Sequence, residues 1–297
     1  HIERAGVHSG DSIAVYPPRT LSEHIIEAII EYTNKLALTL HVKGLLNIQY
    51  IVRDEKLYII EVNPRSSRTV PFLSKVTGIS MVDVATKCAV GKSLKEQGFE
   101  SGLKLFPDYY AVKAPVFSFN KMTDVDITLG PEMKSTGEVM CIDNQFPRAL
   151  YKACVAAGTN VPDKGTILIT VADKDKDEVT EIAEGFEDLG YTIAATEGTA
   201  NFLRSKGMTV ETAAKIGEDS PNLLDDIKEG KICMVINTMN HGESTRSDGF
   251  RIRRSTVEHA IPCLTSLDTA RALQHALGAM RRRRIVSVVA LQDLKTE

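Results

Sequence analysis

The residues with the clearest chemical potential stand at the end of one apolar segment, 58–68. The segment starts with apolar residues and then places Glu61, Asn63, Arg65 and Arg68 close together. Carboxylate and amide oxygens suit a hard cation such as Mg²⁺, and guanidiniums hold phosphoryl oxygens in planar, bidentate fashion. The segment therefore predicts a buried strand that ends at a site for metal-bound phosphates. The alternative is a strand that stops at the proline and continues into a solvated basic turn, and the segment alone does not decide between them.

Two predicted strands, 45–52 and 57–62, position these side chains by forming a hairpin. Side chains alternate between the two faces of a strand, so the length of the connecting loop decides which residues face each other. A three-residue loop places Gln49 opposite Glu61, whereas a two-residue loop places them on opposite faces. We expect the three-residue loop, because it gathers Gln49, Glu61 and Asn63 into one oxygen-rich patch that divalent cations would satisfy. These three residues are the predicted metal ligands.

Two polar loops in the first half are further candidates for ligand contact. Residues 6–12 are small and polar with one histidine, a composition that suits either a phosphate-wrapping loop or an ordinary turn. Residues 129–138 carry a charged centre and either close over a ligand or connect strands. Neither loop is decisive by itself.

Bulk composition sets limits on the class of protein. The 297 residues are enough for two domains, and 43% hydrophobic with 25% charged residues is ordinary for a globular chain. A net charge of −3 gives no basic field for nucleic acid, and we interpret the run 281–284 as a solvated helix end rather than a nucleic-acid patch. No apolar run approaches the ~18 residues of a membrane span. The five cysteines are scattered without a CxxC pair, which favours a reducing, cytoplasmic setting over disulfides or a zinc site.

The pattern of elements changes near 156–165. Beyond that point strands alternate with helices, which predicts a parallel sheet with helices on both faces. The expected strands are 166–171, 191–195, 233–237, 261–264 and 285–289, and the expected helices are 176–189, 199–205, 222–228 and 267–281.

In such a sheet ligands bind beyond the carboxyl ends of the strands. Those ends carry small hydroxyls and lysines, at 173–176, 196–199 and 237–238. Free backbone N–H groups at a helix start make an anion site, and Lys176 and Lys215 add positive charge to it. The alternative is that Thr196 and Thr199 only cap a helix. Agreement among three strand ends favours the anion site.

Four segments of the chain, taken in order, resemble one known family. They are Gly-Val-His-Ser-Gly-Asp-Ser at 6–12, Gly-Leu-Leu-Asn-Ile-Gln-Tyr at 44–50, Ile-Glu-Val-Asn-Pro-Arg-Ser-Ser-Arg-Thr-Val-Pro-Phe at 60–72 and Gly-Pro-Glu-Met-Lys-Ser-Thr-Gly-Glu-Val-Met at 130–140. They are similar to the second synthetase unit of the carbamoyl-phosphate synthase large chain. Residues from about 156 onward are similar to the methylglyoxal-synthase-like regulatory domain of the same chain.

This resemblance implies a fold and two domains. Residues 1–155 would be the C-terminal part of an ATP-grasp α+β domain, and 156–297 a Rossmann-like parallel α/β methylglyoxal-synthase-like domain. It also implies ATP-dependent phosphorylation of carbamate, with Mg²⁺ or Mn²⁺ and a potassium-associated loop near Glu3. Arg4 stands where that loop is expected to have Gln, which puts the K⁺ site in question. Partners would be a glutaminase small chain in an oligomeric intact enzyme, in the cytoplasm, with neither nucleic acid nor membrane.

The resemblance also implies roles for residues at matching positions. Arg65 and Arg68 would hold the transferred phosphoryl, and Gln49, Glu61 and Asn63 the metal. The nucleotide would contact Gly6, Val7, His8, Ser9, Gln49 and Glu61. An allosteric effector such as UMP would contact Thr170, Lys176, Thr196, Thr199, Lys215, Asn237 and Thr238. Met239 stands where a further Thr is expected, which removes a hydroxyl donor from the UMP site.

Two other functions compete with this one. A methylglyoxal-synthase-type lyase needs a catalytic Asp where Asn237 stands, and asparagine is no general base. A free-standing effector-binding module would use the second half alone and would bind UMP regardless of Glu61. The chain starts at His1 rather than Met, so we expect a piece of a longer enzyme that makes no carbamoyl phosphate by itself.

Overall fold

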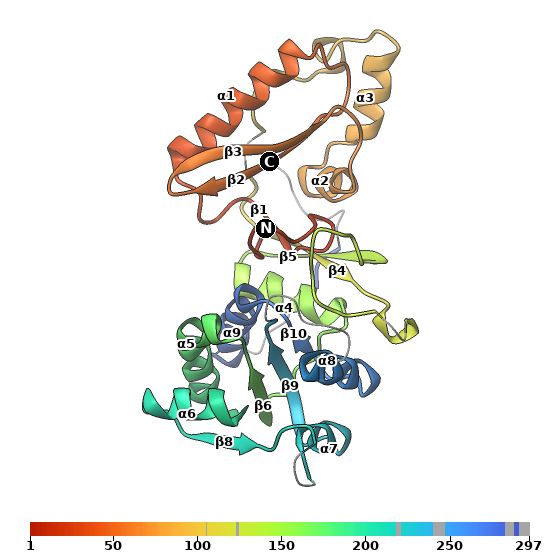
Figure 1. The fold of residues 1–297 in the computed structure, drawn as a ribbon. Helices are drawn as coiled ribbons and strands as arrows, with labels where there is room; N and C mark the ends of the chain where they lie inside the picture. Colours follow the sequence, from red (N-terminus) through yellow and green to blue (C-terminus); the bar gives the residue numbers. More distant parts are fainter. Residues whose placement is uncertain (105, 123–124, 218–220, 240–246, 283–287, 291–297) are drawn as a thin grey trace. The chain divides into compact units, whose positions relative to one another are not determined.

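The computed structural model describes residues 1–104, 106–122, 125–217, 221–239, 247–282 and 288–290 (Figure 1). These residues divide into two compact units, which are described separately. Unit 1 contains 1–14 and 112–286, and unit 2 contains 15–111 and the last residues from 287. The division does not follow the boundary expected near 156. That boundary, as a boundary between families of domain, stays a prediction.

Unit 2 contains the predicted metal strands. Its elements are α1 (Glu23–Thr39), β2 (Asn47–Arg53), β3 (Lys56–Asn63), α2 (Thr69–Thr77), α3 (Met81–Ala89) and the short η1 (Lys95–Gln97). Strands β2 and β3 pair antiparallel in a sheet of their own, and α1 packs against both (Figure 1). With only two strands, the hairpin leaves much of its apolar surface uncovered. Tyr58 is 51%, Ile59 43% and Ile60 54% exposed, so the prediction of a buried strand was wrong.

The hairpin loop has two residues, not the three that we expected. Arg53 pairs with Lys56, and the intervening Asp54 and Glu55 both have positive φ, 51° and 55°. Two-residue turns with positive φ at both positions are favoured because their twist matches that of the flanking strands. The expected loop length was therefore wrong, although the strand pairing that it was meant to produce is present for another reason, given below.

A three-stranded sheet of order β1–β4–β5 joins β1 (Ala14–Tyr16), β4 (Tyr110–Val116) and β5 (Gly137–Asp143). It is followed by α4 (Phe146–Ala156), which packs against β5 and also against α9 (Leu267–Arg282). One face of α4 is almost fully buried, with Ala149 and Ala153 at 0% and Leu150 at 1% exposed. Because α4 shares its apolar face with α9, residues on both sides of position 156 belong to one compact unit.

The parallel sheet of unit 1 has the order β10–β9–β6–β7–β8. Its strands are β6 (Thr166–Thr170), β7 (Thr192–Thr196), β8 (Val210–Ala213), β9 (Ile232–Asn237) and β10 (Cys263–Leu264), and its helices are α5 (Lys176–Asp188), α6 (Glu197–Ser205), α7 (Leu223–Lys228), α8 (Asp248–Glu258) and α9. Two short 3₁₀ helices, η2 (Phe119–Lys121) and η3 (Asp173–Asp175), complete the assignment. The predicted α/β class with a parallel sheet is confirmed. The expected strand 285–289 lies mostly outside the described residues.

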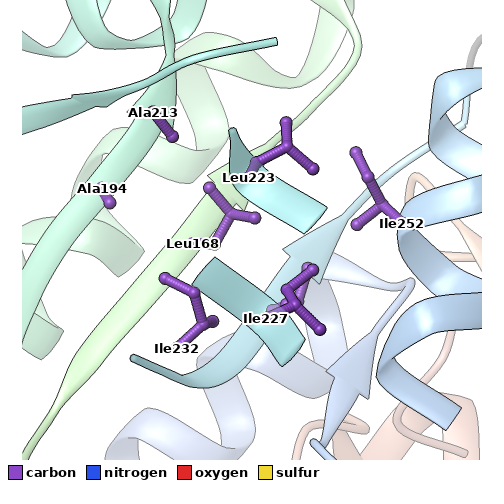
Figure 2. Packing of buried hydrophobic residues seen from close by; sticks show 8 residues of the cluster. Leu168, Ala194, Ala213, Leu223, Ile227, Ile232 and Ile252 are labelled. Carbon is purple, nitrogen blue, oxygen red and sulfur yellow. The ribbon is translucent and has the colours of Figure 1, made fainter. Parts of the chain in front are cut away.

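Alternation along the strands gives this sheet a core on each face. Leu168 faces a cluster in which Leu223 and Ile227 of α7 pack together with Ile232 and with Ile252 of α8 (Figure 2). Ile167 and Ile169, which are fully buried, belong to the opposite face because strand side chains alternate. Helices α5 and α9 pack against each other, and they contact β7 and β10 respectively.

Strand order matters for function because it reverses beside β6. The chain runs from β6 outward through β7 and β8, then returns to β9 on the other side of β6. In open parallel sheets the crevice beyond the carboxyl ends of the strands at such a reversal is the usual ligand site. The ends of β6 and β9 are therefore the expected ligand site in this fold.

Candidate functional sites

A β-bulge pairs the oxygen-bearing side chains of β2 and β3. Tyr50 pairs with Ile59, but the next pair is Gln49 with Glu61, so Ile60 is the extra residue. The added residue shifts the alternation by one position and brings Glu61 opposite Gln49 in spite of the two-residue loop. The predicted pairing is thus present. Asn47 pairs with Asn63 in the same register, which adds a pair of amides beside the amide and carboxylate of Gln49 and Glu61.

The local contacts fit a cation site made of one carboxylate and several amides. Asn63 Nδ2 donates to Glu61 Oε1 at 2.8 Å, and Arg65 Nη2 lies 3.5 Å from Asn63 Oδ1. If the Asn63 amide is rotated, its oxygen faces the same side as the Glu61 carboxylate. A hard cation accepts such a set of oxygen donors. In the described part of the chain no three His, Cys, Asp or Glu residues gather as a metal cluster. Any cation here therefore depends on the amide oxygens of Gln49 and Asn63.

Two arginines follow the strand and both are exposed. Arg65 Nη1 donates to the Ser66 carbonyl at 3.0 Å, which holds the side chain close to the chain end of β3. Arg68 is the N-cap residue of α2. The start of a helix adds backbone N–H groups that favour an anion, so a phosphoryl group between these arginines and α2 would meet positive charge.

The predicted nucleotide loop lies in unit 1 and is held by the loop 129–138. His8 N–H donates to the Gly130 carbonyl at 2.7 Å, and its Nδ1 accepts the Gly10 N–H at 3.0 Å. Asp11, fully buried, accepts the N–H groups of Lys134 at 2.7 Å and Ser135 at 2.9 Å. The second loop therefore supports the first.

Gly6 and Ser9 shape the backbone of this loop and anchor it to a lysine. Gly6 has a φ of 112°, a conformation that side-chain-bearing residues rarely adopt. The Ser9 carbonyl accepts the ammonium of Lys113 at 3.3 Å, and Lys113 is only 4% exposed. Together with Val7 and His8, these are the four predicted nucleotide contacts of the loop, and the structure brings them together in one turn.

A cavity of about 230 Å³ in unit 1 was not predicted from the sequence. Its lining is largely apolar but includes the carboxylates of Glu3 and Asp11. Glu3 accepts the Ile13 N–H at 2.8 Å and the Thr269 hydroxyl at 2.9 Å. Burial raises the pKa of Glu3, and these hydrogen bonds offset only part of that effect. Glu3 and Asp11 both form hydrogen bonds with residues distant in the chain. Such contacts give no signal in the sequence pattern.

At the predicted effector site, a lysine lies over the start of α6. A Cβ added to Gly198 would lie 3.7 Å from the Lys176 ammonium, so that amine stands beside the first turn of the helix. Thr196 is the N-cap residue, yet within the described residues its hydroxyl makes no cap hydrogen bond, which counts against a purely capping role. Lys176 also holds Asp173 at 2.7 Å, and this hydrogen bond lowers the pKa of Asp173. Thr199 is buried and Lys215 is exposed.

The ends of β6 and β9 are tied together by their own side chains. The Thr238 hydroxyl accepts the Ala172 N–H at 3.0 Å, and Asn237 Nδ2 donates to the Thr170 carbonyl at 3.4 Å. Asn237 is 2% and Thr238 9% exposed. Asn237 Oδ1 also accepts from Arg253 of α8, an arginine that the sequence reasoning missed.

Comparisons with known proteins match both halves of the chain. The model of the carbamoyl-phosphate synthase L chain, ATP binding domain, matches residues 2–97. The model of the MGS-like domain matches residues 178–265.

The chain matches the C-terminal portion of a carbamoyl-phosphate synthase large chain.

This assignment confirms the family that the sequence resembles, and with it an ATP-binding part of a ligase followed by an MGS-like part. The match to the carbamoyl-phosphate synthase ATP binding domain contains the loop 6–12 and the β2–β3 hairpin. The match to the MGS-like domain contains the start of α6 and the end of β9. Among solved structures, the biotin carboxylase domain of a single-chain bacterial carboxylase is similar at a TM-score of 0.40 and 18% identity. It covers 49% of this chain, which spans 39% of that structure. A likeness at that level supports no assignment by itself.

In the described part of the chain no helix is long and apolar enough to cross a membrane.

At the end of α9, the Arg281 guanidinium donates to the Asp163 carbonyl and lies 5.0 Å from the centre of the Tyr191 ring. Arg281 therefore has specific partners rather than only solvent, while 283–284 lie outside the described residues.

Proposed function

We propose that this chain forms part of an ATP-dependent ligase that phosphorylates carbamate to carbamoyl phosphate, as in a glutamine-hydrolysing carbamoyl-phosphate synthase. The observation that carries the proposal is the pairing of Gln49 with Glu61 across a bulge in β2 and β3. The bulge serves no evident packing purpose, since Ile60 is 54% exposed. What it does is place the oxygen donors of the two strands opposite each other, inside the range that matches an ATP-binding domain.

In this proposal each group has a separate task. Glu61, Gln49 and Asn63 hold Mg²⁺ or Mn²⁺, which when bound neutralises phosphate charge during in-line transfer. Arg65 and Arg68 hold the phosphoryl oxygens, and the loop of Gly6, Val7, His8 and Ser9 contacts the nucleotide. Phosphoryl transfer of this kind depends on positioning and charge neutralisation, so no side-chain nucleophile is needed. A monovalent K⁺ near Glu3 remains a further proposal.

Calorimetric titration with Mn²⁺ and ATP tests the proposal. Glu61→Gln keeps the shape of the side chain but removes the only carboxylate of the donor set, so we expect at least a tenfold loss of Mn²⁺-dependent ATP affinity. Glu55→Gln is the matched control, because Glu55 is an exposed acid in the turn of the same hairpin. Equal affinity for the parent and Glu61→Gln would reject the metal role. An assay of carbamate-dependent ADP release tests our expectation that this chain alone does not turn over.

We also propose that unit 1 binds a nucleotide monophosphate such as UMP as an allosteric effector. The supporting observation is the Lys176 ammonium beside the first turn of α6, near Thr199. Lysine charge and free backbone N–H groups at a helix start suit a phosphate. UMP titration of Lys176→Met should show at least a tenfold loss, whereas Lys228→Met, at the distant end of α7, should bind as the parent does. Unchanged binding by Lys176→Met would contradict this site.

These tests also separate the alternative, a module that binds an effector without catalysis. Such a module would bind UMP but show no Mn²⁺-dependent ATP binding, and Glu61→Ala would change nothing. In the intact enzyme we propose a glutaminase small chain as partner, an oligomeric assembly and a cytoplasmic location. Co-purification of the full-length large chain with that partner tests the first of these.

A further inference from the structure

Arg253 of α8 is the largest fully buried side chain that carries a charge, at 1% exposure. Its Nε and Nη2 donate to the two carboxylate oxygens of Asp126, at 2.8 and 2.6 Å. Its Nη1 donates to Asn237 Oδ1 at the end of β9. A buried guanidinium needs a carboxylate partner, but the pair with Asp126 already meets that need. The contact with Asn237 adds a link to the predicted effector site.

Asp126 is in turn linked to the loops around the nucleotide-loop candidate. The Lys134 ammonium donates to the carbonyls of Asp126 at 2.9 Å and Thr128 at 2.6 Å. The Lys134 N–H then donates to the buried Asp11 carboxylate at 2.7 Å. A continuous chain of hydrogen bonds therefore runs from Asn237 through Arg253, Asp126 and Lys134 to Asp11, entirely inside unit 1.

A cavity in unit 1 borders residues of both predicted sites. It has a volume of about 280 Å³ and its lining includes Val7 of the nucleotide loop together with Thr238 and Met239 after β9. The two predicted sites therefore border one cavity as well as one hydrogen-bond chain. A group bound at the end of β9 is positioned to affect both.

The Asn237 amide can act as the sensor of this chain. Its oxygen accepts from Arg253, and within the described residues its Nδ2 makes a long hydrogen bond of 3.4 Å to the Thr170 carbonyl. A ligand acceptor that draws Nδ2 turns the amide, and the turned amide no longer presents its oxygen to Arg253 in the same way. A ligand shifts an equilibrium only through such a difference in contacts between two states.

We propose that Arg253 is a positioning residue that couples occupancy of the effector site at the ends of β6 and β9 to the conformation of the nucleotide loop 6–12. The effector half of this inference rests on the proposed function. The link between Arg253 and the loop does not, because it concerns contacts present without any ligand. The two parts are tested separately.

Hydrogen exchange followed by mass spectrometry tests the ligand-free part. Arg253→Lys keeps the charge but cannot reach Asp126 in bidentate fashion and Asn237 at once. We expect exchange in peptides covering 6–12 and 130–136 to accelerate at least fivefold more than exchange in β6, which reports the overall stability of unit 1. Arg251→Lys, an exposed arginine on the same helix, is the control and should match the parent. Asp126→Asn is the second variant and should reproduce the effect at the same peptides.

Two results of this ligand-free experiment would overturn the positioning role of Arg253. One is parent-like exchange at 6–12 in both variants. The other is an acceleration at 6–12 that is no greater than the acceleration in β6 and α5, because that pattern indicates general loss of stability rather than a local effect on the loop.

Addition of UMP tests the coupling. In the parent, saturating UMP should change exchange at 6–12 at least twofold, and in Arg253→Lys that change should vanish although calorimetry still shows UMP binding. Persistence of the full change in Arg253→Lys rejects the coupling. If the parent binds no UMP, the proposed effector function and the coupling both fail, and the ligand-free arm still decides the positioning role.

Discussion

The ion pair of Asp126 and Arg253 leads to a stability prediction with an unusual asymmetry. The two side chains are joined by hydrogen bonds of 2.8 and 2.6 Å, but they differ in exposure, 21% for Asp126 and 1% for Arg253. Breaking a buried pair by removing one partner costs roughly 3–5 kcal/mol, because the other charge is left uncompensated. The cost should therefore depend on which partner remains.

Removal of the carboxylate should be the worse change. In Asp126→Asn the buried guanidinium loses its bidentate carboxylate, so we expect a cost of about 4 kcal/mol, near the middle of that range. In Arg253→Met the carboxylate remains, but it is partly exposed and water can solvate it, so we expect about 3 kcal/mol or less. The double variant should cost less than the sum of the two, with an interaction energy of about 2 kcal/mol.

The sequence contains no tryptophan, so intrinsic fluorescence is a poor probe of one unit. Exchange of the β6 and β9 amides, measured against denaturant, reports the opening free energy of unit 1 directly. Glu258→Gln is the control, since its pair with Arg254 is a surface pair, Glu258 being 54% exposed, and should change stability by at most about 0.5 kcal/mol. Additive costs within about 0.5 kcal/mol, or a larger cost for Arg253→Met than for Asp126→Asn, would refute the reasoning.

Three further predictions concern single buried groups in unit 1. Burial raises the pKa of Glu3 above its ordinary 4.5, so the folded state binds the extra proton and stability falls as pH rises above about 4.5. Glu3→Gln should flatten that slope in denaturant titrations above about pH 4.5, and an unchanged slope would contradict it. Burial also raises the pKa of Cys154 to about 12, so at pH 8 native Cys154 should alkylate roughly 10³-fold more slowly than a free thiol, and modification at the free-thiol rate would show that the buried environment is absent. Phe186 is fully buried and meets Tyr191 edge to face at 5.8 Å; Phe186→Ala should lower the opening free energy of unit 1 by about 3–5 kcal/mol, and a loss below about 1 kcal/mol would contradict this packing.

Local patterns in the sequence were sufficient for much of the fold. Alternating strands and helices after position 166 predicted the parallel sheet, because each pattern depends only on near neighbours and on which face is apolar. The cluster of Glu61, Asn63 and Arg65 at the end of one strand was likewise visible as a set of side chains with one chemistry. Helix α8 was not predicted, and so its buried Arg253 was missed, because a charged residue in a polar stretch gives no sign of burial.

Three features were decided only by the tertiary structure. The pairing of Gln49 with Glu61 was predicted for the wrong reason, since a bulge at Ile60 rather than an odd loop produces it, and bulges have no strong sequence signal. The extent of unit 1 follows from packing of α4 on α9, more than a hundred residues later. The sequence by itself determined which side chains are available for metal, phosphate and effector. Only the fold decided that Asn237, Arg253 and Asp126 meet, because a buried charge is tolerated only where folding brings its partner to it.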